Sequence, residues 1–380
     1  MPLFLGGEQN HVKLNVIENQ MKQEKIAVIG SGNWGSVSAK LVAENALSCP
    51  YYHDEVRMWV YEEILPSGEK LTDVINNTHE NVKYLPNINL GLNVVADPEL
   101  HNAVKDATML IFVTPHQFVE GICKRLQGNV RHDAKAISLI KGMEVKKDGP
   151  CMISSLITEI LGIECCVLMG ANIANEIALE KFSEATIGYR DDKKAAEKWG
   201  ELFSKSYFHV NIVNDVEGVE LCGTLKNIVA IAAGLVDGLQ MGNNTKAAIM
   251  RIGLREMRVF SKLIFPSVRD STFFESCGVA DVITTCLGGR NRKVAEAFAR
   301  HDGQRSFDEL EAELLQGQKL QGVSTAAEIF EVLKARKWEE QFPLFTTVHK
   351  IATGILPVNA VVKYSEHAPR MVVEAAAQYY

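Results

Sequence analysis

The sequence predicts an α/β protein in which a Rossmann-like, doubly wound parallel sheet is followed by a mostly α-helical second half. Three observations support this fold class. Short apolar runs alternate with helical patterns over the first 214 residues, a glycine motif follows the first of these runs, and strand-like runs are scarce after residue 214. At 380 residues the chain is long enough for two domains.

The strand-like runs of the first half are short, apolar and regularly spaced. They cover residues 25–30, 56–61, 109–114, 136–140, 165–169, 185–189 and 208–213. Helical patterns lie between several of them, for example at 37–46 and 151–161. Apolar strands that alternate with helices indicate a parallel sheet covered on both faces.

A glycine motif lies where the first strand meets the first helix. It reads Gly30-Ser31-Gly32-Asn33-Trp34-Gly35, which is G-x-G-x-x-G. The first glycine makes the tight turn, the second lets the backbone approach a pyrophosphate, and the third lets the helix pack close to the strand. The phosphates would bind the free N–H groups of the helix N-terminus. The motif predicts a Rossmann-like dinucleotide site formed by these six residues.

The acidic residue that usually binds the adenosine ribose is expected about 20 residues after such a motif. Here residues 48–55 resemble a loop that lengthens the crossover, and the second strand is expected to end at Tyr61-Glu62-Glu63. Glu62 or Glu63 would repel a 2′-phosphate, and no arginine is adjacent in the sequence to accept one. This pattern favours NAD over NADP.

The second half shows helical spacing at 219–239, 246–264, 292–300, 307–315, 325–337 and 345–353. We therefore predict a boundary near residue 214. The predicted organisation is an N-terminal extension (1–24), a dinucleotide-binding domain (25–214) and a helical substrate and dimerisation domain (215–380).

Composition restricts the partners. A net charge of −7 argues against nucleic acid or an anionic membrane as a general partner. No run approaches the ~18 uncharged apolar residues of a membrane span. The eight cysteines form no CxxC pair and no ligand series, so we expect reduced thiols and no metal site. Residues 1–24 resemble neither a signal nor a transit peptide, and the last residues match no retention signal, so a cytoplasmic location is expected.

Two lone charges lie in apolar helical segments of the second half. Lys226 follows Cys222-Gly-Thr-Leu, and Asp281 precedes Val-Ile-Thr-Thr285. A buried ammonium needs a partner and has a lowered pKa, which makes it a candidate for acid–base chemistry. The alternative is a lysine that snorkels at the helix edge. Asp281 is the expected partner of Lys226, and Thr285 would share its helix face.

Further basic residues stand at element ends. Lys141 follows a predicted strand at its carboxyl end, where ligands of open α/β sheets bind. Gly288-Gly289 would end a helix and present Arg290, whose guanidinium suits a phosphate. The segment from Gln316 through Lys319 to Gln321 is a basic, amide-rich loop.

Taken together, these motifs resemble the NAD-dependent glycerol-3-phosphate dehydrogenases of the eukaryotic cytosolic type. The resemblance covers roughly residues 25 to 350. It is carried by the glycine motif, His116-Gln-Phe118, Ser138-Leu-Ile-Lys141-Gly, Met169-Gly-Ala-Asn-Ile-Ala174, Leu225-Lys226-Asn227, Asn244-Thr-Lys-Ala-Ala, residues 278–292 and Gly317-Gln-Lys-Leu-Gln-Gly322.

The resemblance implies hydride transfer between NAD(H) and the dihydroxyacetone phosphate/sn-glycerol 3-phosphate pair, in a two-domain subunit that is usually a homodimer. It implies that Lys226 is the proton donor or acceptor; with Lys141 and with Asp281 and Thr285, which the helix spacing places beside Lys226, it completes the expected catalytic set. Substrate would contact Lys141, Asn227, Arg290 and Asn291. Besides the glycine motif, the cofactor would contact Tyr61, Phe118, Lys141, Ala174, Arg290, Lys319 and Gln321. Which lysine donates the proton is left open between Lys226 and Lys141.

Two alternatives remain. A 6-phosphogluconate or β-hydroxyacid dehydrogenase would share the order of a Rossmann half and a helical half, but residues 278–292 count against it. A nonenzymatic NADH-sensing or membrane-docking module is the second alternative. The presence of Lys141, Lys226, Asp281 and Arg290 together argues against lost catalysis.

Overall fold

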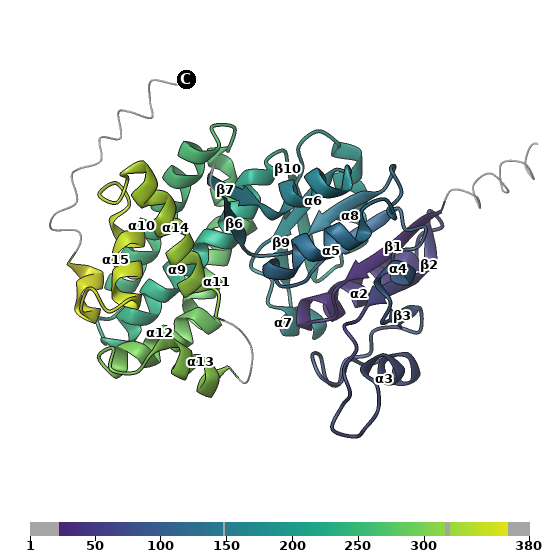
Figure 1. Cartoon of the computed structure of the whole chain (residues 1–380), viewed down its shortest axis with the longest axis horizontal. Helices are drawn as coiled ribbons and strands as arrows, with labels where there is room; N and C mark the ends of the chain where they lie inside the picture. The colour runs from purple at the N-terminus through teal and green to yellow at the C-terminus, as the bar shows by residue number, and fades with distance from the viewer. Residues whose placement is uncertain (1–22, 147–148, 316–319, 364–380) are drawn as a thin grey trace, which may run out of the picture.

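The computed structural model describes residues 23–146, 149–315 and 320–363. A half built around a β-sheet lies beside a half built from helices (Figure 1). This arrangement confirms the predicted fold class: a Rossmann-like sheet comes first, and the helical half follows it.

The sheet has eight strands in the order β10-β9-β8-β5-β4-β1-β2-β3. Their bounds are β1 Glu24–Ile29, β2 Tyr52–Trp59, β3 Val94–Asp97, β4 Met109–Phe112, β5 Lys135–Ser138, β8 Cys165–Met169, β9 Ser183–Gly188 and β10 Phe208–Val213. All neighbours are parallel except β8 and β9, which are antiparallel. Strand order reverses between β1 and β4, and ligands of such sheets bind at this switch point.

Helices cover both faces of the sheet because each crossover contributes one. They are α2 Asn33–Ala46, α3 Leu71–Thr78, α4 Leu100–Ala103, α5 Val119–Leu126, α6 Ile153–Leu161, α7 Ala174–Ala178 and α8 Lys193–Phe203. Alternate residues of β1 face opposite sides, as the strand period requires. Ile26 and Val28 pack in the core shared with α2 and α8, whereas Ala27 and Ile29 pack in the core shared with α5 and α6.

Several predicted boundaries in this half were wrong. Strand β2 begins at Tyr52 and ends at Trp59, so part of the expected loop 48–55 is strand and Tyr61 lies beyond the strand end. His53, Asp54 and Glu55 resemble loop residues because they are polar. They can nevertheless belong to a strand, because none of the three is buried. Strand β3 and the hairpin of β6 Met143–Lys146 with β7 Gly149–Met152 were not predicted, and α6 begins at Ile153 rather than 151.

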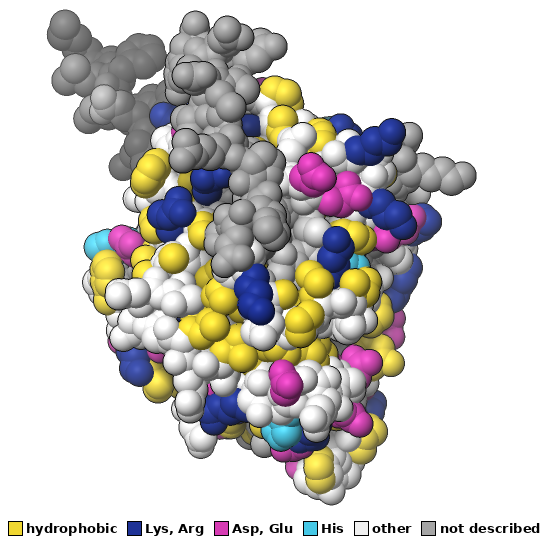
Figure 2. Space-filling view, turned by 90° about the vertical axis from the view of Figure 1, so that its left-hand side faces the viewer, with side chains coloured by type: hydrophobic (Ala, Val, Ile, Leu, Met, Phe, Trp, Pro, Cys, Tyr) yellow, Lys and Arg dark blue, Asp and Glu magenta, His cyan; other side chains and the backbone are white. Residues whose placement is uncertain are grey.

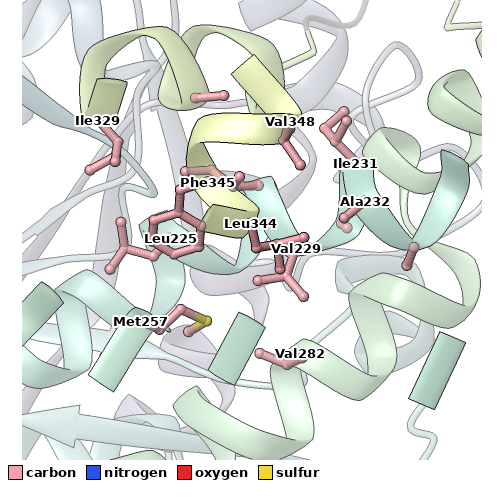
Figure 3. Close-up of a cluster of buried hydrophobic side chains, with 14 of the residues drawn as sticks. Leu225, Val229, Ile231, Ala232, Met257, Val282, Ile329, Leu344, Phe345 and Val348 are labelled. Atoms are coloured by element: carbon pink, nitrogen blue, oxygen red, sulfur yellow. The ribbon is translucent and has the colours of Figure 1, made fainter. Parts of the chain in front are cut away.

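The helical half surrounds one central helix, α9 Val216–Gly238. The helices that pack against it are α10 Asn243–Ile264, α11 Asp281–Gly288, α12 Arg290–Arg300, α14 Gly322–Arg336 and α15 Pro343–Ala352, and α13 Phe307–Leu314 packs against α12. Figure 3 shows Leu225 and Val229 of α9 in a core with Met257, Val282 and Phe345 from other helices. Among the described residues, α9 alone is long and apolar enough to cross a membrane, but its apolar stretch is 100% buried within the protein, as in a core helix.

Close packing of α12 against α9 fixes where α12 begins. A Cβ added to Gly234 would lie 2.3 Å from the carbonyl oxygen of Arg292, and one added to Gly238 would lie 2.5 Å from that of Glu296. Only glycine allows the two backbones to approach so closely. The first residue of α12, Arg290, is therefore held at a defined place beside α9.

Candidate active site

The glycine motif has the geometry that a dinucleotide requires. Gly30 has a φ of +122°, and a Cβ there would lie 2.9 Å from the carbonyl oxygen of Val113. A Cβ on Gly35 would lie 2.2 Å from the carbonyl oxygen of Gly30, whereas one on Gly32 would meet nothing within 4 Å. Gly32 is also the N-cap of α2, where no described side chain caps the helix. The open position and the free helix N-terminus fit a pyrophosphate.

The other residues of the motif fasten the loop to its surroundings. Asn33 Nδ2 donates to the carbonyl of Tyr84 and to Asn175 Oδ1, both at 2.7 Å. Trp34 Nε1 donates to the carbonyl of Asn172 at 3.0 Å. The carbonyl of Ser31 accepts a hydrogen bond from Asn81. The side chains of Asn33 and Trp34 therefore shape the loop rather than point away from the protein.

Buried polar atoms without a protein partner lie near this loop. Thr114 Oγ1 and Asn172 Oδ1 are buried and accept or donate no hydrogen bond within the described part of the chain. Thr114 follows β4 and its Cγ2 lies 3.0 Å from a Cβ built on Gly30, whereas Asn172 follows β8 and binds Trp34. Because buried polar groups are normally satisfied, these atoms suit the polar groups of a bound cofactor such as NAD.

A cluster of four side chains forms the chemical centre. Lys226 Nζ on α9 donates to Asp281 Oδ1 at 2.5 Å and to Thr285 Oγ1 at 2.6 Å. Lys141 Nζ, beyond the end of β5, donates to Asp281 Oδ2 at 3.3 Å. The structure thus brings together Lys226, Lys141, Asp281 and Thr285, the set that the sequence singled out for catalysis. They come from three segments that are far apart in the chain.

The central lysine, Lys226, is buried, and burial changes its pKa. The side chain of Lys226 is only 6% exposed, which excludes the alternative of a lysine snorkelling at a helix edge. Burial lowers its pKa, the Asp281 carboxylate opposes that effect, and the Lys141 charge adds to it; the pKa stays below its ordinary value. A lysine of this kind can exchange a proton near neutral pH.

An irregular turn fixes the position of Asp281, the carboxylate partner of Lys226. A π-helical turn, Ser276–Ala280, precedes α11, and Asp281 is the first residue of that helix. A Cβ on Gly278 would lie 2.3 Å from the carbonyl oxygen of Phe273, so this turn requires glycine. Thr285 lies one turn beyond Asp281, on the same face.

A threonine that the sequence analysis missed holds the second lysine. The N–H of Gly142 donates to Thr224 Oγ1 at 3.2 Å, and the Thr224 hydroxyl lies 3.3 Å from the carbonyl of Gly142. Thr224 is on α9, two residues before Lys226, so one helix fixes both lysines. Nothing in the sequence distinguishes a threonine that binds a distant backbone from one that packs in a core.

The expected substrate amides form a buried chain. Asn291 Nδ2 donates to Asn227 Oδ1 at 2.9 Å, and the N–H of Gly322 donates to Asn291 Oδ1 at 2.9 Å. Gln321 is thereby held next to Asn291. Arg290, at the start of α12, is exposed.

The remaining cofactor candidates are spread around the sheet half. Tyr61 and Phe118 are 74% and 56% exposed, and Ala174 begins α7. Lys319 lies outside the described residues.

The two candidate ribose carboxylates are both engaged in local bonds. Glu62 accepts hydrogen bonds from the N–H of Thr72 at 3.2 Å and from its hydroxyl at 2.5 Å, at the start of α3. Glu63 accepts from Lys83 and, at 2.7 Å, from the hydroxyl of Tyr84. The sequence could not separate these neighbours because their partners lie 10 to 21 residues away.

Comparisons with known proteins agree with this geometry. The family models for the N-terminus and the C-terminus of NAD-dependent glycerol-3-phosphate dehydrogenase match residues 25–195 and 215–363. A glycerol-3-phosphate dehydrogenase [NAD(+)] from Cuphea lanceolata is 75% identical, over 90% of this chain and 92% of its own.

Other relatives carry names that state a location. An Arabidopsis thaliana enzyme of the same name, described as chloroplastic, is 73% identical over 92% of this chain and 87% of its own. A Drosophila melanogaster enzyme described as cytoplasmic is 51% identical over 90% of this chain and 94% of its own. The solved glycerol-3-phosphate dehydrogenase of Saccharomyces cerevisiae superposes with a TM-score of 0.85 at 46% identity, covering 91% of this chain and 100% of that one.

Proposed function

The chain belongs to the NAD-dependent glycerol-3-phosphate dehydrogenases, and we propose that Lys226 is the group that exchanges a proton with the substrate oxygen. Membership makes it an NAD-dependent enzyme and supports hydride transfer between NAD(H) and the dihydroxyacetone phosphate/glycerol 3-phosphate pair. It decides against the 6-phosphogluconate and nonenzymatic alternatives. When bound, the nicotinamide supplies or accepts the hydride.

One observation supports this role: Lys226 Nζ is fixed by Asp281 and Thr285 inside an apolar helix. Reduction of the ketone leaves negative charge on its oxygen, which a nearby ammonium can stabilise and then protonate. The Asp281 carboxylate holds the ammonium in place and balances its charge. In the oxidation direction the neutral amine would take the proton from the hydroxyl.

Lys141 is the weaker candidate for the proton donor. Its side chain is 23% exposed, compared with 6% for Lys226, and its bond to Asp281, at 3.3 Å, is longer than the 2.5 Å bond of Lys226. We assign Lys141 to orienting the substrate oxygen.

The phosphate and the cofactor are assigned to the remaining residues. Arg290, with Asn291 and Asn227, would hold the phosphate end of the substrate, because a guanidinium at a helix start suits a dianion. The cofactor would contact the glycine motif and the residues that the sequence indicated, which are Tyr61, Phe118, Lys141, Ala174, Arg290, Lys319 and Gln321.

Replacing each lysine by methionine tests the assignment. Lys226→Met should lower kcat by about 10²–10⁴-fold, while NADH affinity measured by fluorescence changes little. Lys141→Met should mainly raise KM for dihydroxyacetone phosphate. Near-normal turnover of Lys226→Met, with a large loss of kcat in Lys141→Met, would exchange the two roles.

We further propose that the subunit forms a homodimer in the cytoplasm through its helical half, with the domain boundary near residue 214. Figure 2 shows hydrophobic side chains gathered among lysines and arginines on the end of the molecule formed by this half. Its exposed hydrophobic residues include Leu263 and Ile355, and apolar surface of this kind favours association. Light scattering should give about twice the subunit mass of 42.0 kDa.

The proposed cytoplasmic location has its own test. One relative is described as chloroplastic and another as cytoplasmic, so fractionation of cells that express the tagged protein tests the location.

A further inference from the structure

An ion pair lies beyond the carboxyl end of β2, at the edge of the sheet. Glu63 Oε2 accepts a hydrogen bond from Lys83 Nζ, and Glu63 Oε1 accepts one from the Tyr84 hydroxyl at 2.7 Å. The Lys83 ammonium also lies 5.0 Å from the centre of the Tyr84 ring. Both charged side chains are partly open to solvent, at 29% and 39% exposure. The pair is accessible, so a ligand can contact it.

This pair adjoins the glycine motif. Asn81 Nδ2 donates to the carbonyl of Ser31 at 2.8 Å and to Ser36 Oγ at 2.9 Å. The carbonyl of Tyr84 accepts from Asn33 Nδ2 at 2.7 Å. Lys83 therefore lies in a segment bound at both ends to the residues that would hold the pyrophosphate.

The surface around the pair is hollowed and apolar. A depression is lined by Glu63, Ile64, Leu65, Val82 and Lys83, together with Pro66 and Ser67. Tyr61, on the strand β2 side of the same segment, is exposed. In sheets of this topology, the adenosine of a dinucleotide lies near the end of the second strand, where an acidic side chain meets the ribose 2′-hydroxyl. Apolar walls beside an ion pair suit a purine and its ribose.

We propose that the Glu63–Lys83 pair determines the choice between NADH and NADPH. Glu63 repels a 2′-phosphate and also occupies the one ammonium in this segment that could bind it. Lys83 could thus bind a 2′-phosphate only when its ammonium is not paired with Glu63. Glu62 has no part in the choice, because Thr72 holds its carboxylate at the start of α3. The inference rests on the proposed position of the cofactor at the glycine motif.

The test uses the full-length protein and fluorescence titration with NADH and NADPH, without substrate. Glu63→Gln should lower the ratio of the NADPH to the NADH dissociation constant by about tenfold or more, because the ammonium becomes free to bind the 2′-phosphate. The double variant Glu63→Gln/Lys83→Met should lose most of that gain. The ratio of kcat/KM for the two cofactors should follow the binding ratio.

Two controls separate the possible failures. Glu62→Gln removes the neighbouring charge and should leave the ratio of dissociation constants unchanged. Gly32→Val adds a side chain where nothing lies within 4 Å, so the fold should tolerate it, and it should abolish NADH binding if the pyrophosphate lies there.

Each contrary result has one meaning. If Gly32→Val abolishes NADH binding but Glu63→Gln leaves the ratio unchanged, the role of the ion pair is overturned and the cofactor position stands. If the double variant keeps the full gain, Lys83 is not the 2′-phosphate site. If Gly32→Val binds NADH normally, the cofactor position itself is wrong.

Discussion

An ammonium group in an apolar helix can be tolerated only with a partner close by, and this requirement made Lys226 and Asp281 visible in the sequence. Each is a lone charge among apolar neighbours, and the structure joins them at 2.5 Å. The bond from Lys141 to the second oxygen of Asp281 could not be predicted. It depends on how a loop after β5 meets a residue that lies 140 positions later, at the start of α11, and no local pattern encodes such a contact.

The lowered pKa of Lys226 predicts a specific pH dependence. Burial favours the neutral amine, so the protonated form that ketone reduction requires is lost at a pH well below the ordinary lysine pKa of about 10.4. The kcat for reduction should therefore fall as pH rises through the lowered pKa of Lys226, and the kcat for oxidation should rise. Initial rates in both directions over a pH series give the two curves.

A second variant identifies the group behind these curves. Asp281 raises the Lys226 pKa, so Asp281→Asn should move the inflection of the reduction curve to lower pH. It should also lower kcat. An inflection that stays in place in Asp281→Asn would mean that another group titrates.

Arg290 gives the prediction that addresses the substrate class. A hydrogen bond to a charged group contributes about 1.5–3 kcal/mol, so Arg290→Ala should lower kcat/KM for dihydroxyacetone phosphate by roughly 10–150-fold. Unphosphorylated dihydroxyacetone lacks the group that Arg290 would bind, so its low kcat/KM should fall much less. The ratio of the two values at saturating NADH is the informative quantity. An unchanged ratio would remove Arg290 as the phosphate anchor.

At the scale of elements, periodicity predicted helix α10 well because one face of this helix lies in a core. Helix α10 was expected at 246–264 and spans Asn243–Ile264. Short strands at sheet edges were missed, since β3 has four residues and follows a polar segment. The antiparallel placement of β9 beside β8 was also missed, because strand direction depends on the path of the chain rather than on composition.

Helix α15 depends on a buried carboxylate from α10. Glu256 Oε1 and Oε2 accept the N–H groups of Leu344 and Phe345 at 2.8 and 3.0 Å, which satisfies donors at the start of α15. In the sequence Glu256 follows Arg255 in a charged stretch and looks like a surface residue. Burial nevertheless raises its pKa to about 8, although both backbone bonds oppose that change.

This raised pKa makes part of the stability pH-dependent. A carboxyl with a pKa of 4.5 in the unfolded chain and about 8 in the folded one favours folding at low pH, and the contribution is lost as pH rises between the two values. Glu256→Gln cannot ionise. The free energy of unfolding of the wild type, minus that of Glu256→Gln, should therefore decrease across this range. Urea unfolding at several pH values measures it, and a pH-independent difference would contradict the assignment.

At the scale of the whole molecule, the sheet half and the helical half are joined through polar contacts of α9. Glu220, on the first turns of α9, accepts hydrogen bonds from the N–H and the hydroxyl of Ser154 at the start of α6. Four residues later, Thr224 binds Gly142. The sequence predicted two halves and an active site drawn from both, but not the contacts between them, because a buried glutamate in an apolar helix gives no indication of its partner.

Loss of the Ser154 hydroxyl should weaken this connection in a pH-dependent way. Glu220 is completely buried, and burial raises its pKa to about 7 while the Ser154 bonds oppose that rise. Above this pH the wild-type carboxylate is ionised, and the hydroxyl donates to a charged group. Ser154→Ala should then lower the free energy of unfolding by about 1–3 kcal/mol. Below the pKa, where the carboxyl is protonated, the loss should be smaller.

Ser155→Ala is the matched control, because it alters the next residue of α6, which is only partly buried, and should change stability little at either pH. Activity gives the second measurement. Glu220 and Thr224 lie one turn apart on α9, so a loosened α6 contact should reach Gly142 and the adjacent Lys141, and KM for dihydroxyacetone phosphate should rise in Ser154→Ala. Equal destabilisation by both alanine variants, with KM unchanged, would show that this hydroxyl stabilises α6 locally and does not couple the two halves of the site.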